Sequence, residues 1–513
     1  MRRILAAWAA LLWLASPASA APKDGTLVIA FKQENPTMDP HTESSQISNA
    51  INRWVIQTLM HRTPEGKLVP LLVKTHKWVD SKTLDLELRE GIKFSNGEDF
   101  DANAVKFSLE RIHDPKIKSR QRGRFRVVGE KNAVQVLSKY KVRINLAFPD
   151  AGFLNRLGNV GGIVPPKYYA SKDPIYLASH PIGSAPYLLK KWVRDDHAEF
   201  EANPRFWDPQ YPKVKRVILK VIPEDTARVA ALINGEVDVV FGVPPTMWDK
   251  VNASGKAKVV MKPGIRIFRL GFYNKWGGIF NDKRVRMAVA HAIDRKTLQN
   301  TVLKGLAVDA THVLHPLTEG YLKPERFPYP YPYDPEKSKK LLAEAGHPNG
   351  IEVDMVAQVR SYLKDREAAE VVAGMLQKAG IKVNMTQLNN RGYRNAFRKH
   401  RNKAGDDFKP FLYFHSFGGG GGDSDLQLGA VAGCKGAWSG WCDKNFGKML
   451  NDASSLTDPE ERQKAFEDLT KKLTNDLAFV PLYRINETFG LSNRVAWDPR
   501  VDERPMAWEI GLK

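Results

Sequence analysis

Histidines are the first residues of this 513-residue chain that could do chemistry, as metal ligands or proton carriers. His312 and His315 come nearest to a ligand pair, but Pro316 and the surrounding loop composition favour a structural role. The chain contains no H-E-x-x-H helix, no G-x-S-x-G nucleophile elbow and no dinucleotide fingerprint. We therefore predict that the protein is not an enzyme and has no catalytic residues, no metal of its own and no cofactor.

A run of five glycines, residues 418–422, is the second feature that could form a functional site. A phosphate-binding loop would end in Gly-Lys-Ser/Thr, whereas here Asp423-Ser424-Asp425 follows and would repel phosphate. The sequence therefore argues against a nucleotide site. Asp423 could instead contact another ligand, or it could cap the helix expected over 426–431.

The first twenty residues predict export. Arg2 and Arg3 precede an apolar run over 4–15, and Ala18-Ser19-Ala20 provides a cleavage pattern, so residues 1–20 are interpreted as a Sec signal peptide. No cysteine stands at the cleavage point to carry a lipid, which favours a soluble protein of the Gram-negative periplasm. The two cysteines, Cys434 and Cys442, are expected to form a disulfide in that oxidising compartment, with two free thiols as the alternative.

The formal charge of +21 comes from 78 Lys and Arg against 57 Asp and Glu. The basic residues are dispersed among acidic ones, and the densest patch, residues 118–126 (KSRQRGRFR), has no nucleic-acid motif beside it. We interpret this patch as solvated surface and predict no nucleic-acid partner.

Strand-like and helix-like segments alternate along the chain, which predicts an α/β protein. Strands are expected at 26–31, 83–89, 134–136, 142–146, 214–221, 237–241, 353–356, 381–385 and 411–414, and helices at 102–112, 227–233, 282–304, 335–345 and 365–379.

Five segments, in order along the chain, resemble one family. They are LELREGIKFSNGEDFDANAVKFSLERI at 86–112, PIGSAPYLLKKW at 181–192 with EANPRFWD at 201–208, INGEVDVV at 233–240, NDKRVRMAVAHAIDRKTL at 281–298 and YDPEKSKKLLAEAG at 333–346. The chain resembles the family 5 periplasmic solute-binding proteins of ABC importers, of the peptide, oligopeptide and nickel-binding type.

This resemblance implies a two-lobed, type II Venus-flytrap fold. Lobe I would comprise residues 21–268, with an extra subdomain at about 55–180, and lobe II residues 269–480. Residues 481–513 would return to lobe I. The chain would cross between the lobes at 265–273 and 479–485, which allows hinge closure around a ligand.

Candidate ligand-binding residues follow from the rule that ligands lie beyond the carboxyl ends of strands and from the resemblance, which places an ammonium-binding aspartate and a carboxylate-binding arginine. They are Phe31, Glu34, Tyr273, Arg360, Phe417, Asp423, Asp425, Trp438 and Trp441. The aspartate of the family aligns with Gly420, which cannot pair with an ammonium group. Surface exposure for Arg360, a turn for Glu34 and packing for the aromatic residues are the alternatives.

We therefore expect a monomeric receptor that binds a di- or oligopeptide and delivers it to an inner-membrane ABC permease. A nickel chelate, glutathione, an opine or an oligosaccharide are alternative solutes. A periplasmic chaperone and a secreted hydrolase are the alternatives from other classes.

Overall fold

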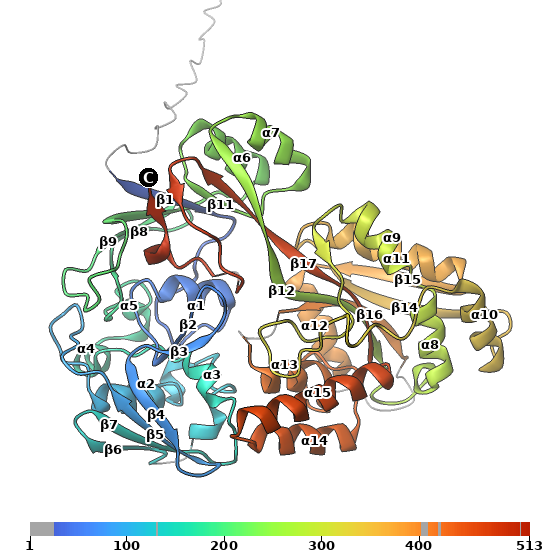
Figure 1. Cartoon of the computed structure of the whole chain (residues 1–513), viewed down its shortest axis with the longest axis horizontal. Coiled ribbons are helices and arrows are strands. Elements are labelled where there is room, and N and C mark those ends of the chain that lie inside the picture. The colour runs from blue at the N-terminus through green and yellow to red at the C-terminus, as the bar shows by residue number, and fades with distance from the viewer. Residues whose placement is uncertain (1–24, 130–131, 402–408, 419–421, 503) are drawn as a thin grey trace, which may run out of the picture.

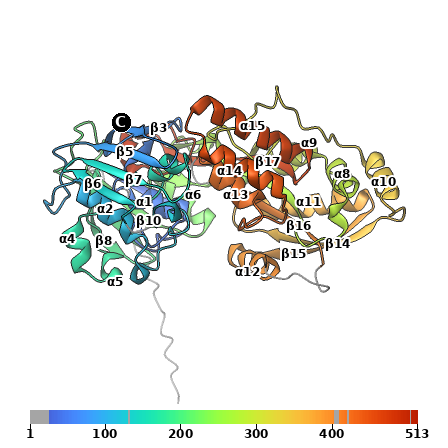
Figure 2. The same ribbon diagram turned by 90° about the horizontal axis from the view of Figure 1, so that it is seen from below.

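The computed structural model describes residues 25–129, 132–401, 409–418, 422–502 and 504–513. The expected signal peptide, residues 1–20, and Gly420 lie outside the described residues. Within these ranges, no helix combines the length and the apolar character needed to cross a membrane. Figure 1 shows two halves joined by long strands, and Figure 2 shows the same halves from below.

One large mixed sheet runs through both halves. From one edge to the other, its strands are β15 (Ile381–Leu388), β14 (Ile351–Gln358), β16 (Phe411–Phe417), β12 (Ala257–Tyr273), β17 (Phe479–Ser492), β11 (Val239–Phe241), β1 (Thr26–Phe31), β10 (Arg216–Val221), β9 (His197–Ala202) and β8 (Tyr187–Val193), with β13 (Ala307–Val308) beside β17. The predicted strands are all present, mostly with slightly different ends.

Strands β12 and β17 form the connection between the halves (Figure 1). They pair in antiparallel fashion from Ala257–Ser492 to Gly271–Phe479, and their register shifts between Pro263 and Ile267. Both strands are longer than the predicted crossings at 265–273 and 479–485. The reason is that each continues beyond the crossing into the sheet of the first half, where β17 also pairs with β11.

The first half carries an additional four-stranded sheet. Its order is β4 (Val73–Trp78), β5 (Thr83–Leu88), β7 (Lys141–Asn145) and β6 (Val134–Ser138), and α2 (Ala102–Arg111) contacts it. Buried Phe94, Phe100 and Leu109 belong to the separate hydrophobic core of this unit. A short pair, β2 (Met60–Arg62) and β3 (Leu68–Pro70), lies beside it, and β18 (Val495–Ala496) pairs with β19 (Gly511–Leu512).

Helices cover the sheets. The remaining ones are α1 (Gln46–Asn52), α3 (Phe153–Leu157), α4 (Pro166–Ser171), α5 (Pro174–Leu177), α6 (Asp225–Asn234), α7 (Trp248–Ala253), α8 (Lys283–His291), α9 (Arg295–Thr297), α10 (Pro335–Glu344), α11 (Asp365–Lys378), α12 (Asn390–Arg401), α13 (Ser424–Ala432), α14 (Lys444–Ser455) and α15 (Pro459–Asn475).

The single helix predicted over 282–304 is wrong, because the structure divides this segment. Helix α8 ends at His291, and Asp294 begins a new helical segment by accepting a hydrogen bond from the Thr297 amide at 2.9 Å. An aspartate in this position competes with the continuing helix for backbone donors. The apolar spacing of the segment does not reveal this interruption.

Gly271 tests how closely β12 packs against β16. A Cβ at this position would lie 2.0 Å from Cζ of the fully buried Tyr413. We expect Gly271→Ala to lower the free energy of unfolding by about 1–3 kcal/mol, as overpacking does. Gly374→Ala in α11 is the matched control, because its Cβ meets no atom within 4 Å. This control should gain about 0.5–1 kcal/mol. Equal effects in urea unfolding would contradict this packing.

Candidate functional site

The two halves meet around α3 of the first half and the segment that follows β16 in the second. Arg156 in α3 donates through Nε to Asp423 Oδ2 at 3.2 Å. The backbone amide of Ala151 donates to the carbonyl of Ser454 in α14 at 2.9 Å. These contacts hold the carboxyl end of β16 against the extra subdomain.

Asp423 is fully buried and performs two structural tasks. Its Oδ1 accepts the Leu426 amide at 3.0 Å and so caps α13, while Oδ2 faces Arg156. The pKa of Asp423 is raised to about 7: burial is the largest cause, the charge of Arg156 opposes it, and Asp425 and Asp150 act in the same direction as burial. The capping role foreseen for Asp423 is therefore present, whereas a role in ligand binding stays a prediction.

The partners of the Asp425 carboxylate both belong to the second half of the molecule. Its Oδ2 accepts Nη2 of Arg462 in α15 at 2.5 Å, and its Oδ1 accepts the hydroxyl of Ser454. The Arg462 guanidinium also lies 3.5 Å from Glu319. Asp425 thus belongs to an ion-pair network with Arg462 and Glu319. Its role in ligand binding stays a prediction.

Arginines approach both described ends of the glycine run. A Cβ on Gly418 would lie 3.2 Å from Nη2 of Arg266, and a Cβ on Gly422 would lie 2.6 Å from Nη2 of Arg62. Glycine at these two positions therefore permits a close approach of guanidinium groups to the backbone. Arg266 comes from β12 and Arg62 from β2, so they reach this region from the crossing strand and from the first half.

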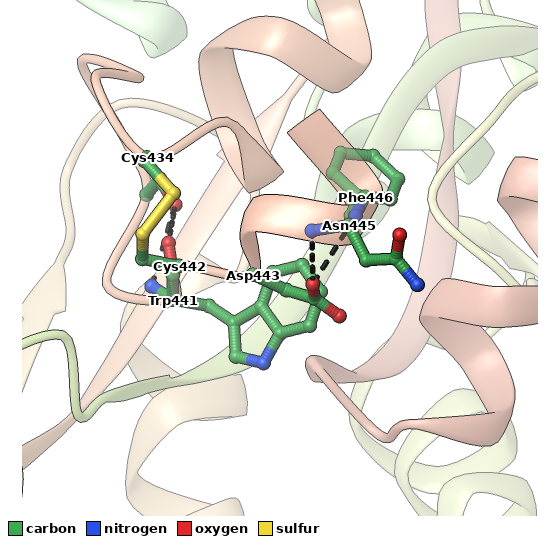
Figure 3. Close-up of a disulfide and its surroundings, with 7 residues drawn as sticks. Cys434, Trp441, Cys442, Asp443, Asn445 and Phe446 are labelled. Atoms are coloured by element: carbon green, nitrogen blue, oxygen red, sulfur yellow. Dashed lines mark hydrogen bonds between the residues drawn. A yellow bond between two sulfur atoms is a disulfide. The ribbon is translucent and has the colours of Figure 1, made fainter. Parts of the chain in front are cut away.

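Phe417 and Trp441 lie near this loop and serve packing. Phe417 at the end of β16 is half-buried, and Trp441 packs at 5.6 Å, edge to face, on Phe446. Figure 3 shows the predicted disulfide between Cys434 and Cys442 beside Trp441, so this prediction is confirmed. In the same view, the Asp443 carboxylate caps α14 through the amides of Asn445 and Phe446.

The structure does not bring Tyr273 together with Phe417. Tyr273 pairs with Phe411 at the amino end of β16, six residues from Phe417, which corresponds to roughly 20 Å along a strand. It is fully buried and stacks on Phe411 at 4.7 Å. Trp438 stacks on His415 at 4.8 Å. Both rings therefore contribute to an aromatic core on α12.

Two of the three predicted residues near other strand ends, Phe31 and Glu34, contact other side chains. Phe31 is buried and stacks on Phe241 at 4.8 Å. Glu34 accepts the indole N–H of Trp192 at 2.8 Å and lies 3.6 Å from Arg194. Arg360 is exposed after β14.

The turn after β14 is shaped by the backbone of Arg360. Arg360 has a φ of 62°, and its amide donates to Asp365 Oδ1 at 2.8 Å. The Arg360 side chain is exposed to solvent. A role as a carboxylate clamp stays a prediction.

Sequence reasoning missed the arginines of the first half that face this region. Arg62, Arg156 and Arg504 stand in segments without a motif, far apart along the chain. Arg124 lies in the densest basic patch, 118–126. The local density of basic residues is therefore a sequence signal that could have pointed to it. Among the described residues, no group of three or more His, Cys, Asp or Glu side chains could hold a metal ion.

Residues 67–439 match the bacterial extracellular solute-binding proteins, family 5 (middle). The chain therefore belongs to this family, and the resemblance inferred from its five segments is confirmed. A curated relative is the glutathione-binding protein GsiB of Escherichia coli K12. It is 27% identical over 369 residues, which cover 72% of this chain and 70% of that protein.

Solved structures share the two-lobed α/β fold. The substrate-binding protein CtaP of Listeria monocytogenes has a TM-score of 0.83 at 20% identity, covering 96% of this chain and 100% of that one. The binding protein AgaA of A. tumefaciens, in complex with agropinic acid, has a TM-score of 0.77 at 21% identity, covering 95% and 99%. These likenesses confirm the predicted fold class.

The raised pKa of Asp423 predicts a pH dependence of stability. Its folded value of about 7 exceeds the ordinary 3.8, so the unfolded chain releases this proton first as pH rises. The contribution of Asp423 to the free energy of unfolding is therefore present at low pH and declines between about pH 4 and pH 7. Asp423→Asn keeps a capping oxygen but has no such proton.

We expect wild type to lose stability relative to Asp423→Asn across this range, with no further change above it. Urea unfolding of both proteins at intervals from pH 4 to pH 8 measures the difference. A difference that stays constant with pH would contradict the raised pKa.

The disulfide should stabilise the segment before α14. Its cysteines are eight residues apart, and closing so short a loop is worth about 2–3 kcal/mol. We expect Cys434→Ser combined with Cys442→Ser to lower the free energy of unfolding by that amount. A reductant should destabilise wild type and leave the double variant unchanged, and an equal effect on both would contradict the assignment.

Proposed function

We propose that this protein is a periplasmic receptor that binds a di- or oligopeptide, or a peptide-like solute, between its lobes. The observation that carries the proposal is the pair of strands β12 and β17, which run continuously from one half of the sheet to the other. Two long strands can bend as a hinge while each lobe keeps its own core. Membership of the solute-binding family supports the same role.

The hinge is assigned to the register shift between Pro263 and Ile267. The Arg484 guanidinium donates to the Gly264 carbonyl at 2.9 Å and so braces β17 against this irregular segment. We place lobe I at residues 21–268 with its subdomain at about 55–180, lobe II at 269–480, and the return to lobe I at 481–513. Closure brings Arg156 to Asp423 and encloses the solute.

The cellular role follows from the same proposal. The chain is exported by a signal peptide over residues 1–20, carries no lipid, and acts as a monomer without nucleic acid. It hands its solute unchanged to an inner-membrane ABC permease, and no bond is broken. Peptide-like solutes are favoured because the family fold also holds the peptide STSA in DppA of Helicobacter pylori, a chain 22% identical with a TM-score of 0.77 that covers 96% of this chain and 99% of that one.

Thermal unfolding in the presence of a solute panel tests this function. A true ligand at 100 times its dissociation constant should add about 2.7 kcal/mol to the free energy of unfolding. The panel should contain di- to pentapeptides, glutathione, opines, nickel–histidine and oligosaccharides, and mass spectrometry should show each solute recovered intact. Maltose-binding protein is a suitable control for non-specific stabilisation.

The opposite results are equally clear. A chemically altered solute would overturn the receptor function in favour of a hydrolase. Competition by unfolded proteins, with no solute shifting the melting temperature, would favour a chaperone.

A further inference from the structure

A cavity in lobe I is separate from the place where the lobes meet. It has a volume of about 190 Å³, and the described residues of its wall lie within 53–71 and 206–211, at Pro186, and at Trp508 and Glu509. All of them belong to lobe I as placed above, and none to lobe II. The described wall therefore does not require the two lobes to close.

Strand β2 shows which way this cavity faces. His61 of β2 lines it, whereas the next residue, Arg62, approaches Gly422 in the second half of the molecule, where a Cβ would lie 2.6 Å from Nη2 of Arg62. Successive side chains of a strand point to opposite faces. The cavity therefore lies on the face of β2 that is turned away from the glycine run and from the solute site proposed between the lobes.

The volume of the cavity suits one small molecule. A cavity of about 10–15 Å³ suffices for a single water molecule, whereas pockets for drug-sized ligands enclose about 300–1,000 Å³. The value of about 190 Å³ lies between these limits. A molecule that fills this cavity is thus larger than water and smaller than an oligopeptide.

Aromatic side chains form much of the wall. Phe206, Trp207, Tyr211 and Trp508 line the cavity, and each is half-buried. The indole N–H of Trp207 donates to Gln57 at 3.1 Å, so its polar group is already bonded and the ring is what it offers to a ligand. Small-molecule sites are typically lined by apolar and aromatic side chains with a few polar groups, and aromatic rings pack favourably on one another. The wall therefore favours a ligand with an aromatic ring.

Arg53 supplies a cation to the same wall. Its side chain is 4% exposed, and its Nη2 donates to the carbonyl of Gly158. Its Nε and Nη1 make no hydrogen bond among the described residues. A guanidinium group keeps its charge when buried, and its planar fork matches the two oxygens of a carboxylate. Arg53 therefore has unused donors that a carboxylate would satisfy.

Glu509 supplies a carboxyl group to the wall and is also incompletely bonded. It is 8% exposed, and its Oε1 accepts Nη1 of Arg500 at 2.5 Å. Its Oε2 has no donor in the described part of the chain. The nearest imidazole nitrogen, Nε2 of His61, lies 3.9 Å from Oε1, which is beyond hydrogen-bond distance. Buried polar atoms of proteins are usually hydrogen-bonded, so this oxygen has room for a donor from a ligand.

We propose that this cavity is a second ligand site, which binds one small aromatic molecule that carries both a carboxylate and an ammonium group, as a free aromatic amino acid does. The carboxylate pairs with Arg53, the ammonium group pairs with Glu509, and the ring packs against Trp207 and Trp508. This site goes beyond the receptor function and does not depend on the solute held between the lobes.

Calorimetry on the mature chain with four related probes tests this recognition. The probes are L-phenylalanine, 3-phenylpropionate without the ammonium group, phenethylamine without the carboxylate, and L-alanine without the ring. We expect L-phenylalanine to bind, and 3-phenylpropionate and phenethylamine to bind about tenfold more weakly or worse, because each loses one hydrogen-bonded charge. L-Alanine should not bind.

Variants of the two charged residues connect each loss to its side chain. Glu509→Gln should weaken L-phenylalanine about tenfold and leave 3-phenylpropionate unchanged, since that probe has no ammonium group. Arg53→Gln should weaken L-phenylalanine in the same way and leave phenethylamine unchanged. Trp508→Leu should weaken every probe that carries a ring. Trp276→Leu is the matched control, because it removes an exposed tryptophan of lobe II.

Glu509→Gln keeps the shape of the side chain and provides a folded test even if Arg53→Gln, which removes a buried contact, does not fold. Circular dichroism shows which variants are folded. Absence of L-phenylalanine binding, equal binding of the three ring-bearing probes, or binding that Glu509→Gln and Trp508→Leu leave unchanged would overturn the second site and keep the receptor function. Binding of L-phenylalanine with the expected variant effects, but no response to the wider solute panel, would support the second site and overturn the receptor function.

Discussion

The pairing of β12 with β17 is the constraint on which the rest of the structure depends. Both strands are members of a single sheet that spans the two halves, so the position of each lobe is set by how these strands bend and pair. Strand β16 pairs with β12 in antiparallel fashion over seven residues, and α13 follows β16 in the chain. The distance between Asp423 and Arg156 is therefore a consequence of strand geometry far from either side chain.

The interface between the lobes buries charged side chains, and their pairing determines its electrostatic properties. Burying a charge is costly unless a partner of opposite sign compensates it, and Arg156 serves Asp150 and Asp423 at once. Burial nevertheless raises the pKa of Asp423 to about 7. A carboxyl in this state, already capping a helix, is a poor partner for a solute ammonium group. Such an arrangement stabilises the contact between the lobes.

Local sequence patterns predicted most of the fold and much less of the site. The β-rich run Thr26–Phe31 became a buried strand, and the spacing over 102–112 became α2, because both depend on neighbours along the chain. The break at Asp294 depends on one capping hydrogen bond. Tyr273 lies at the far end of β16 because antiparallel pairing with β12 places it there. The register between two strands far apart in the chain cannot be predicted from the spacing of residues along the sequence.

The basic patch at 118–126 shows why composition alone misjudges function. Arg122 in this patch is exposed, whereas Arg124, two residues later, is half-buried and lies within electrostatic reach of Asp423. In water the two side chains would be equivalent, because solvent screens both charges. Folding makes them different by removing water from one of them, and a charge in surroundings of low dielectric constant acts more strongly on its neighbours. The overall excess of +21 therefore says less about this protein than the burial of individual guanidinium groups.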